Sequence, residues 1–337
     1  MFNALSNLPR LLLQQELRPM QGERFQPTGF ADLGAAIYET ASGQRRLLVE
    51  SAQSVANRME AACLDGGGPE ILPDLNGLPY VRVRLTGPVD TVTTSLSEAH
   101  RINSPYIVTN KVFQAPFLQS TGYAKGKPLD WPKIANTIFR YDPNSIIHGI
   151  FMANLLDGRM RLSRVLSGFI EAENVREAAS GGVKNNALDP KGEIRAKNHD
   201  KNVYGNVPYQ RMEYTAAPIV AYFNLDLALL RSYKLPDAAT ALLQALALFK
   251  VRRFLNQGLR LRTACDLRPA GDLNSDSSAA YVVPPEADLL AAVQEGIVAC
   301  TQGGLFAEPC VTELITECVE KVTDDKEKKH VEEAPAA

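Results

Sequence analysis

The sequence predicts an α+β fold with a mostly antiparallel sheet. Several short segments alternate apolar and polar side chains, as strands that are covered on one face do. Turn residues separate neighbouring strand segments by only a few positions, so the strands follow one another as hairpins more often than as strand–helix units. Hydrophobic residues make up 45% of the 337 residues, which is enough to build the core of one large domain or two ordinary ones.

The first part of the chain predicts strands followed by a helix. Residues 11–17 form the first expected strand, and two further strands flank a turn at residues 41–43. Residues 51–63 place apolar side chains at helical spacing, and Ser51 is a natural N-cap for that helix.

Residues 64–160 are heterogeneous, and we interpret them as an insertion into the main fold. The segment YVRVRL alternates and predicts a strand with Arg82 and Arg84 on its polar face. The segment TSLSEAHRINSPYI predicts a short helix that ends before Pro105.

The later part of the chain predicts more helix than strand. Residues 236–258 form the longest expected helix. Residues 259–267 alternate as one strand, with Thr263 on its apolar side. Amphipathic segments around residues 287–300 and 311–322 predict two further helices.

A long polar segment separates two strand-like segments between residues 164 and 226. It is rich in Gly, Asn and Lys and nearly free of large aliphatic side chains, so it cannot form a core. Loops of this length inside a compact domain are usually functional or disordered. The composition suits contact with an anionic partner, and Gly181 and Gly182 would allow a ligand close to the backbone.

The distribution of charge permits a polyanionic partner. The formal net charge is −2, yet residues 263–337 hold 5 basic and 15 acidic side chains, while residues 1–262 hold 31 and 23. A basic body with an acidic C-terminal part is compatible with nucleic acid bound to the body.

Common catalytic and metal-binding patterns are absent from the sequence. It has no nucleotide-binding glycine loop, no serine-hydrolase elbow and no HExxH. Its five cysteines form no CxxC pair, which indicates reduced thiols and no zinc site. Asp32 and the pair His199-Asp200 are candidates for metal-assisted RNA cleavage, against the simpler interpretation of turn residues.

Two constellations are candidates for phosphate contact. Ser51, Gln53 and Ser54 stand at the start of a helix, where free amides suit a phosphate, but taken alone they are better explained by simple N-capping. Arg45, Arg46 and Arg58 flank the same helix end and favour a contact with a nucleic-acid backbone. Arg260 and Arg262 share one strand face, which is either solvated or a surface for a single strand of nucleic acid.

The sequence resembles a known family through several motifs in matching order. These are RPMQGERFQPTGFADLGAAIY, LLVESAQSVANRME, HRINSPYI, DPNSIIHGIF, FIEAENVREAASGGVKNN, GNVPYQR, YFNLDL and GLRLRTACDL. Together they are similar to the backbone subunit of type I CRISPR effector complexes, the Cas-seven family of the RAMP superfamily, in its subtype I-U version, also called I-G.

The resemblance implies an RRM-like (ferredoxin-like) antiparallel palm sheet with a finger insertion and a long thumb β-hairpin. On this basis the chain divides into a first palm part (1–63), a finger-like insertion (64–160), a palm strand (161–179), the thumb hairpin (180–212), a second palm part with C-terminal helices (213–322) and a disordered tail (323–337).

Residue roles follow from the same resemblance. The expected RNA-binding residues are Arg24, Gln26, Arg45, Arg46, Ser51, Gln53, Ser54, Asn57, Arg58, Arg164, Arg176, Lys184, Asn185, Asn186, Arg260 and Arg262. The candidates for a thumb side chain that wedges bases apart are Val183, Leu188, Val203 and Tyr204. The family often has two basic residues where this chain has Ala56 and Asn57, and Arg58 is the candidate to replace them.

The resemblance implies a non-catalytic scaffold that binds CRISPR guide RNA, polymerises head-to-tail along it and presents it for pairing with target DNA in antiviral defence. Its expected partners are guide RNA, target DNA through the guide, further copies of itself, a large subunit, a guide-end-capping subunit and a recruited helicase-nuclease. We expect a cytoplasmic protein with no cofactor, metal or membrane contact. The alternative is a metal-dependent ribonuclease of the RAMP superfamily.

Overall fold

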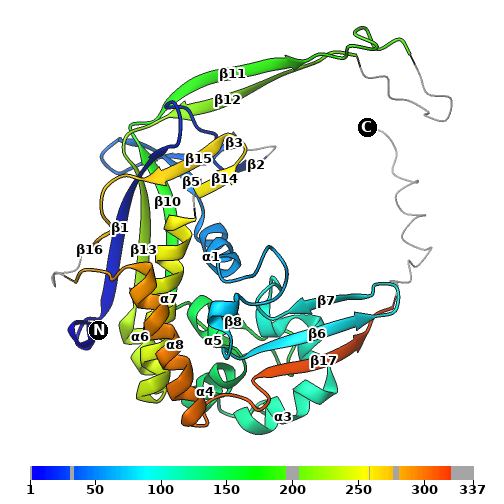
Figure 1. Ribbon diagram of the computed structural model, residues 1–337, viewed down its shortest axis with the longest axis vertical. Coiled ribbons are helices and arrows are strands. Elements are labelled where there is room, and N and C mark those ends of the chain that lie inside the picture. The colour runs from blue at the N-terminus through cyan, green and yellow to red at the C-terminus, as the bar shows by residue number, and fades with distance from the viewer. Residues whose placement is uncertain (1, 31–33, 195–204, 258, 276–280, 320–337) are drawn as a thin grey trace. The chain divides into compact units, whose positions relative to one another are not determined.

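A computed structural model describes residues 2–30, 34–194, 205–257, 259–275 and 281–319 (Figure 1). The chain forms two compact units. The first unit consists of Met1–Cys63, Val165–Ser232 and Thr240–Val293, and the second of Leu64–Arg164, Tyr233–Ala239 and Gln294–Ala337. The segment that begins at Gln294 therefore clusters with the insertion and not with the palm segments.

The first unit is built on one antiparallel sheet. Its strand order is β14-β15-β1-β13-β10-β5-β4, and β16 also pairs with β1. Neighbouring strands along this path are antiparallel throughout, which confirms the predicted α+β class. The strands are β1 (Arg10–Pro19), β4 (Ile37–Glu39), β5 (Arg45–Glu50), β10 (Leu166–Glu173), β13 (Ile219–Asp226), β14 (Leu259–Arg262), β15 (Cys265–Pro269) and β16 (Asn274–Ser275).

Along the chain, the helices of the first unit alternate with its strands in a recognisable order. In chain order, β1, α1 (Ala52–Ala61), β10, β13, α7 (Asp237–Asn256) and β15 follow the pattern β-α-β-β-α-β. The four strands of that pattern lie in the spatial order β15-β1-β13-β10, which is fourth, first, third, second. The remaining elements are η1 (Asn3–Leu5), the strand pair β2 (Gly29–Phe30) and β3 (Gly34–Ala35), α6 (Leu227–Ser232) and the first half of α8 (Glu286–Gln302), whose residues from Gln294 on belong to the second unit.

One face of the sheet is buried and the other is partly open. Along β1, Leu11, Leu13, Gln15 and Leu17 are buried, and the alternate residues Leu12, Gln14 and Glu16 are more exposed. Burying each of these leucine side chains contributes about 1.5–3 kcal/mol. On the other face, the rings of Phe169 and Tyr222 stack with their centroids 5.1 Å apart. This alternation gives the sheet a core side and a side that is available for contact.

A two-stranded hairpin projects from the main sheet (Figure 1). Strand β11 (Arg176–Lys184) pairs antiparallel with β12 (Val207–Thr215), from Arg176 opposite Thr215 at its root to Lys184 opposite Val207. Gly181 lies midway along β11, opposite Gln210 of β12. A Cβ atom on Gly181 would lie 2.7 Å from the carbonyl oxygen of Tyr209, so this glycine permits the close approach of the partner strand.

The second unit contains a three-stranded sheet and short helices. Its sheet has the order β17-β6-β7. Its elements are η2 (Pro73–Leu75), β6 (Tyr80–Thr86), β7 (Thr91–Thr94), η3 (Arg101–Asn103), α2 (Pro105–Val108), α3 (Lys111–Thr121), α4 (Trp131–Tyr141), α5 (Pro143–His148), β8 (Ile150–Phe151), β9 (Arg161–Leu162) and β17 (Val311–Glu317).

Two predictions of local structure are wrong, and a third is incomplete. Residues 311–317 form strand β17, parallel to β6, because this stretch alternates and its Leu314 is buried. The short helix η3 ends before Pro105 as expected, but a further helix, α2, begins at Pro105, since proline fits the first helical position and Ser104 caps the helix. Residues 259–267 form the hairpin β14–β15 and not one strand, and Thr263 is exposed in its turn.

Among the residues that the structure describes, no helix has both the length and the apolar character needed to cross a membrane.

Candidate nucleic-acid interface

Glu50 ties together several of the predicted RNA-binding residues. Its carboxylate is 2% exposed and accepts hydrogen bonds from Ser54 Oγ and from the Arg262 guanidinium. Arg58 Nε lies 3.4 Å from Glu50 Oε1, and Arg58 Nη2 donates to the carbonyl of Leu261 at 2.6 Å. The structure therefore brings Ser54, Arg58 and Arg262 together, but around an internal carboxylate.

The start of α1 is capped from within the chain. Ser51 Oγ accepts a hydrogen bond from the Ser54 amide at 3.3 Å, which confirms the predicted N-cap. Arg262 also donates to the carbonyls of Gln26 and Val49, at 3.1 and 3.3 Å. Gln53 and Asn57 are exposed on the same helix. The side chains at this helix start therefore help to join β5, α1 and β14.

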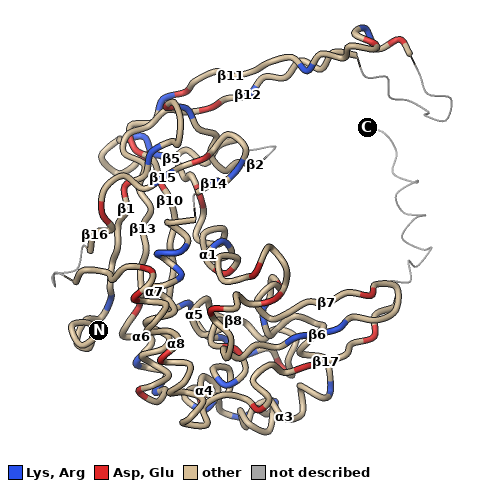
Figure 2. The backbone as a smooth tube through the Cα atoms, viewed as in Figure 1, with Lys and Arg blue, Asp and Glu red and all other residues tan. Residues whose placement is uncertain are grey.

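The arginines at the hairpin end of the sheet are mostly ion-paired. Arg46 Nη2 lies 2.8 Å from Glu173, and Arg45 Nη2 lies 2.7 Å from Glu177. The carboxylate of Glu213, which is 5% exposed, lies 3.6 Å from Arg24 and 2.6 Å from Arg211. In Figure 2, basic and acidic positions accordingly lie close together around the root of the hairpin.

Directly after β11, residues 186–194 form a turn, and several of their side chains are exposed. Asn186 Oδ1 accepts the amides of Leu188 and Asp189, both at 3.0 Å. Hydrogen bonds from the amides of Ile194, Glu193 and Gly192 hold the pKa of Asp189 below its ordinary value. This turn is therefore ordered by its own polar side chains.

The remaining predicted residues are distributed over both units. Lys184, Asn185, Arg176 and Arg260 are exposed, and Arg164 is half-buried within the second unit. Of the wedge candidates, Val183 and Leu188 are 55% and 83% exposed. Val203 and Tyr204 lie outside the described residues.

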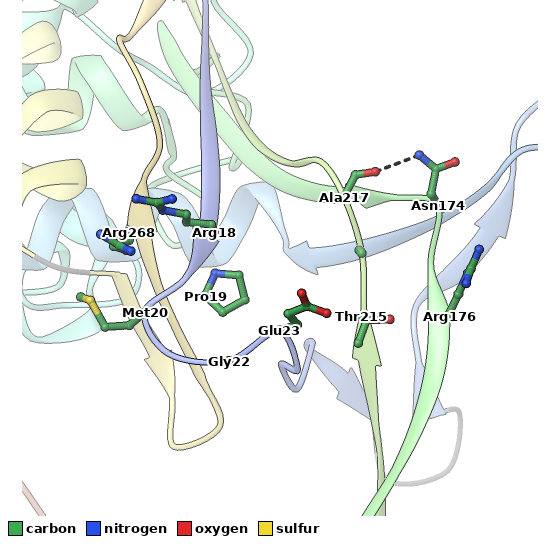
Figure 3. A pocket seen from close by; sticks show the side chains of 11 residues that line it. Arg18, Pro19, Met20, Gly22, Glu23, Asn174, Arg176, Thr215, Ala217 and Arg268 are labelled. Carbon is green, nitrogen blue, oxygen red and sulfur yellow. Dashed lines mark hydrogen bonds between the residues drawn. The ribbon is translucent and has the colours of Figure 1, made fainter.

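A hollow at the root of the hairpin contains two arginines that the sequence analysis missed (Figure 3). It has a volume of about 630 Å³, and its lining includes Arg18, Arg176 and Arg268. Arg18 on β1 and Arg268 on β15 are direct cross-strand partners. Sequence alternation alone could not pair them, because 250 positions separate them in the chain.

The described residues contain no group of three or more His, Cys, Asp or Glu side chains that could hold a metal ion. Asp32, His199 and Asp200, the candidates for metal-assisted cleavage, lie outside those residues. Burial raises the pKa of the thiols of Cys265 and Cys300 to about 11, so neither forms an appreciable thiolate at neutral pH.

Comparisons with known proteins give a family match and distant structural matches, two of which are described below. Residues 11–177, just under half of the chain, match the family described as CRISPR-associated protein GSU0053. This match confirms that the segment resembles CRISPR-associated proteins. No curated protein matches the chain.

The structural matches are weak. A chain of a CRISPR RNA-guided surveillance complex in a pre-nicking state has 14% identity and a TM-score of 0.39, covering 77% of this chain and 73% of its own. Csc2 from Thermofilum pendens has 9% identity and a TM-score of 0.29, covering 91% and 79%.

Proposed function

We propose that this chain is a guide-RNA-binding backbone subunit of a type I CRISPR effector complex, of the subtype called I-U or I-G. The observation that carries the proposal is the family match over residues 11–177. That segment runs from β1 through α1 and β10 into the root of the hairpin. The match therefore covers most of the first palm part, the finger-like insertion and the palm strand of the sequence-based division, and it ends before the segment assigned to the thumb.

The arrangement of the first unit is compatible with this role. Its β-α-β-β-α-β order and its strand order β15-β1-β13-β10 are those of an RRM-like palm. The hairpin β11–β12 carries exposed polar side chains, and β11 is followed by a turn that Asn186 and Asp189 hold with hydrogen bonds. In the proposed role the hairpin acts as the thumb, and the side chain that separates two bases is one of Val183, Leu188, Val203 and Tyr204.

A scaffold for guides of any sequence has to contact phosphate, ribose and shape, and leave the base edges free for pairing. Specificity then comes from pairing between guide and target DNA, as in other RNA-guided effectors. In this role the chain is non-catalytic, binds further copies head-to-tail along the guide, and joins a large subunit and a guide-end-capping subunit. A helicase-nuclease is recruited to the assembly.

The test is to purify the full chain from cells that also transcribe a CRISPR array, and to sequence the RNA that copurifies. We expect RNA with a shared repeat-derived end and a sedimentation mass corresponding to several protein copies on each RNA. The absence of RNA, or a sample of unrelated cellular RNA, would contradict the proposal. Incubation of the complex with labelled RNA and Mg²⁺ tests the non-catalytic role, because metal-dependent cuts abolished by Asp32→Ala would indicate a ribonuclease.

A further inference from the structure

Two arginines face each other across neighbouring strands at the hairpin end of the main sheet. Arg18 on β1 is the direct partner of Arg268 on β15, so both side chains lie on the same face. Both are exposed, and neither forms a side-chain hydrogen bond or ion pair with any residue in the described ranges. Like charges directly opposite each other destabilise a sheet, so this pair weakens the protein as it stands.

The two arginines of β5 near this end of the sheet have carboxylate partners. Arg46 pairs with Glu171 and Glu173, and Arg45 pairs with Glu177. In the register of the sheet, Glu173 pairs with Arg46, while the preceding residue Ala172 pairs with Ile219, and Ile219 pairs with Leu17. Arg18 follows Leu17 and therefore lies in the same row of the sheet as Glu173 and Arg46. Unlike Arg46, it has no carboxylate partner among the described residues.

The unpaired arginines line the hollow at the root of the hairpin. Arg18 and Arg268 lie on one side of the hollow, and Arg176 of β11 lies on the other (Figure 3). Like the other two, Arg176 is exposed and has no carboxylate partner among the described residues. The lining also includes Glu23, which forms no ion pair with any of the three arginines. Three cations against one carboxylate leave the hollow with a net positive charge.

We propose that this hollow binds a phosphate group of single-stranded RNA, held between the cross-strand pair Arg18 and Arg268 and supported by Arg176. A phosphate accepts paired hydrogen bonds from a guanidinium fork, and one anion between two arginines removes their mutual repulsion. The identification of RNA as the source of the phosphate rests on the proposed function, whereas the anion site itself does not. Arg18 and Arg268 thus lower the stability of the free protein and raise its affinity for RNA.

The first experiment measures thermal unfolding of the full chain freed of nucleic acid, in sodium phosphate and in sodium chloride of equal ionic strength. Phosphate should raise the Tm of the wild type above its value in chloride, because a bound anion stabilises the folded state. In chloride, Arg268→Gln should raise the Tm by up to about 3 °C, since it removes the repulsion. In phosphate, Arg268→Gln should not raise the Tm above that of the wild type, because the bound anion already removes the repulsion.

The second experiment measures binding of a labelled single-stranded RNA at several salt concentrations. Arg18→Gln with Arg268→Gln should weaken binding about tenfold. It should also reduce the slope of log K against log salt by about 0.7, the value for one lost phosphate contact. Glu23→Gln should strengthen binding, because it removes a carboxylate from the lining. The matched control, Lys125→Gln with Lys127→Gln, removes two exposed charges of the second unit and should leave the slope unchanged.

The outcomes separate this inference from the proposed function. If phosphate stabilises the wild type no more than chloride, there is no anion site and the inference is overturned whatever the RNA result. If the wild type binds RNA and the double arginine variant keeps the full salt slope, the RNA contact is overturned while the scaffold function stands. If the wild type binds no RNA, the proposed function fails, and RNA fails with it as the source of the phosphate.

Discussion

The Glu50 carboxylate is 2% exposed and holds Ser54, Arg58 and Arg262 from three separate elements. Replacing Glu50 by Ala leaves two guanidinium groups, 32% and 23% exposed, without their partner. We expect a loss of about 3 kcal/mol in the free energy of unfolding, at the low end for a broken buried ion pair because both arginines remain partly solvated. Urea unfolding followed by circular dichroism measures this loss.

The control for this variant is Glu177→Ala. Glu177 also pairs with an arginine of β5, Arg45, but its side chain is 48% exposed. Because exposed ion pairs contribute about 0–1 kcal/mol, this variant should unfold close to the wild type. Equal losses for the two variants would show that Glu50 is no more important than a surface carboxylate.

At the residue scale, the sequence predicted the capping role of Ser51 but not the partners of the arginines. A cap depends on residues three positions apart, so local pattern is sufficient. The contact between Arg262 and Glu50 joins residues 212 positions apart, and nothing in local pattern indicates it. For the same reason the sequence did not distinguish Arg262, held by Glu50, from Arg268, which has no carboxylate partner in the described residues.

At the element scale, two adjacent glycines in β11 have different environments. A Cβ on Gly181 would lie 2.7 Å from the backbone oxygen of Tyr209, whereas a Cβ on Gly182 would lie 3.2 Å from the hydroxyl of the Tyr209 side chain. Backbone cannot move without separating the strands, but a half-exposed tyrosine can rotate. Gly181→Ala should therefore weaken the hairpin by about 1–3 kcal/mol, while Gly182→Ala should have little effect.

Hydrogen exchange of the β11 and β12 amides, compared with those of β1, measures this difference. The hairpin has only two strands, so its protection depends on its own cross-strand contacts. We expect faster exchange in the hairpin of Gly181→Ala and unchanged exchange in β1. Equal exchange in the two glycine variants would mean that the close approach of β12 does not limit the hairpin.

Elements were predicted best where the local pattern is strong. The alternating first strand was expected because it buries one regular face. The long helix α7 was expected from its apolar stripe, and the structure buries residues 242–251 of this helix on all sides. The segment now seen as β17 was expected to be helical, since its apolar residues also fit a helical spacing. The segment forms a strand because it pairs with β6, more than 220 positions earlier in the chain. This pairing is a property of the fold and not of the segment.

At the scale of the whole molecule, the path of the chain makes the second unit depend on a late segment. Leu64–Arg164 forms most of that unit, yet its sheet is completed by β17, which pairs with β6 over seven residues. The sequence analysis recognised the insertion but treated it as a continuous segment. A boundary that depends on pairing between distant segments cannot be read from composition.

Truncation tests this dependence. A chain that lacks residues 311–337 loses β17 and the burial of Leu314, which alone contributes about 1.5–3 kcal/mol. We expect hydrogen exchange of β6 to become faster while that of β1 and β13 stays unchanged. A chain that lacks only residues 320–337 retains β17 and should exchange as the full chain does.

A point variant provides the same test without removing any residue. Gly87 has φ of +108°, and a Cβ there would collide with the carbonyl oxygen of Cys318, whose amide donates to Thr86 at 2.7 Å. Gly87→Ala should therefore displace the end of β17 and reduce protection at the end of β6. If neither the truncation to residue 310 nor Gly87→Ala alters exchange in β6, then β17 is not required for order in the second unit, and the insertion folds on the contacts of Leu64–Arg164 without it.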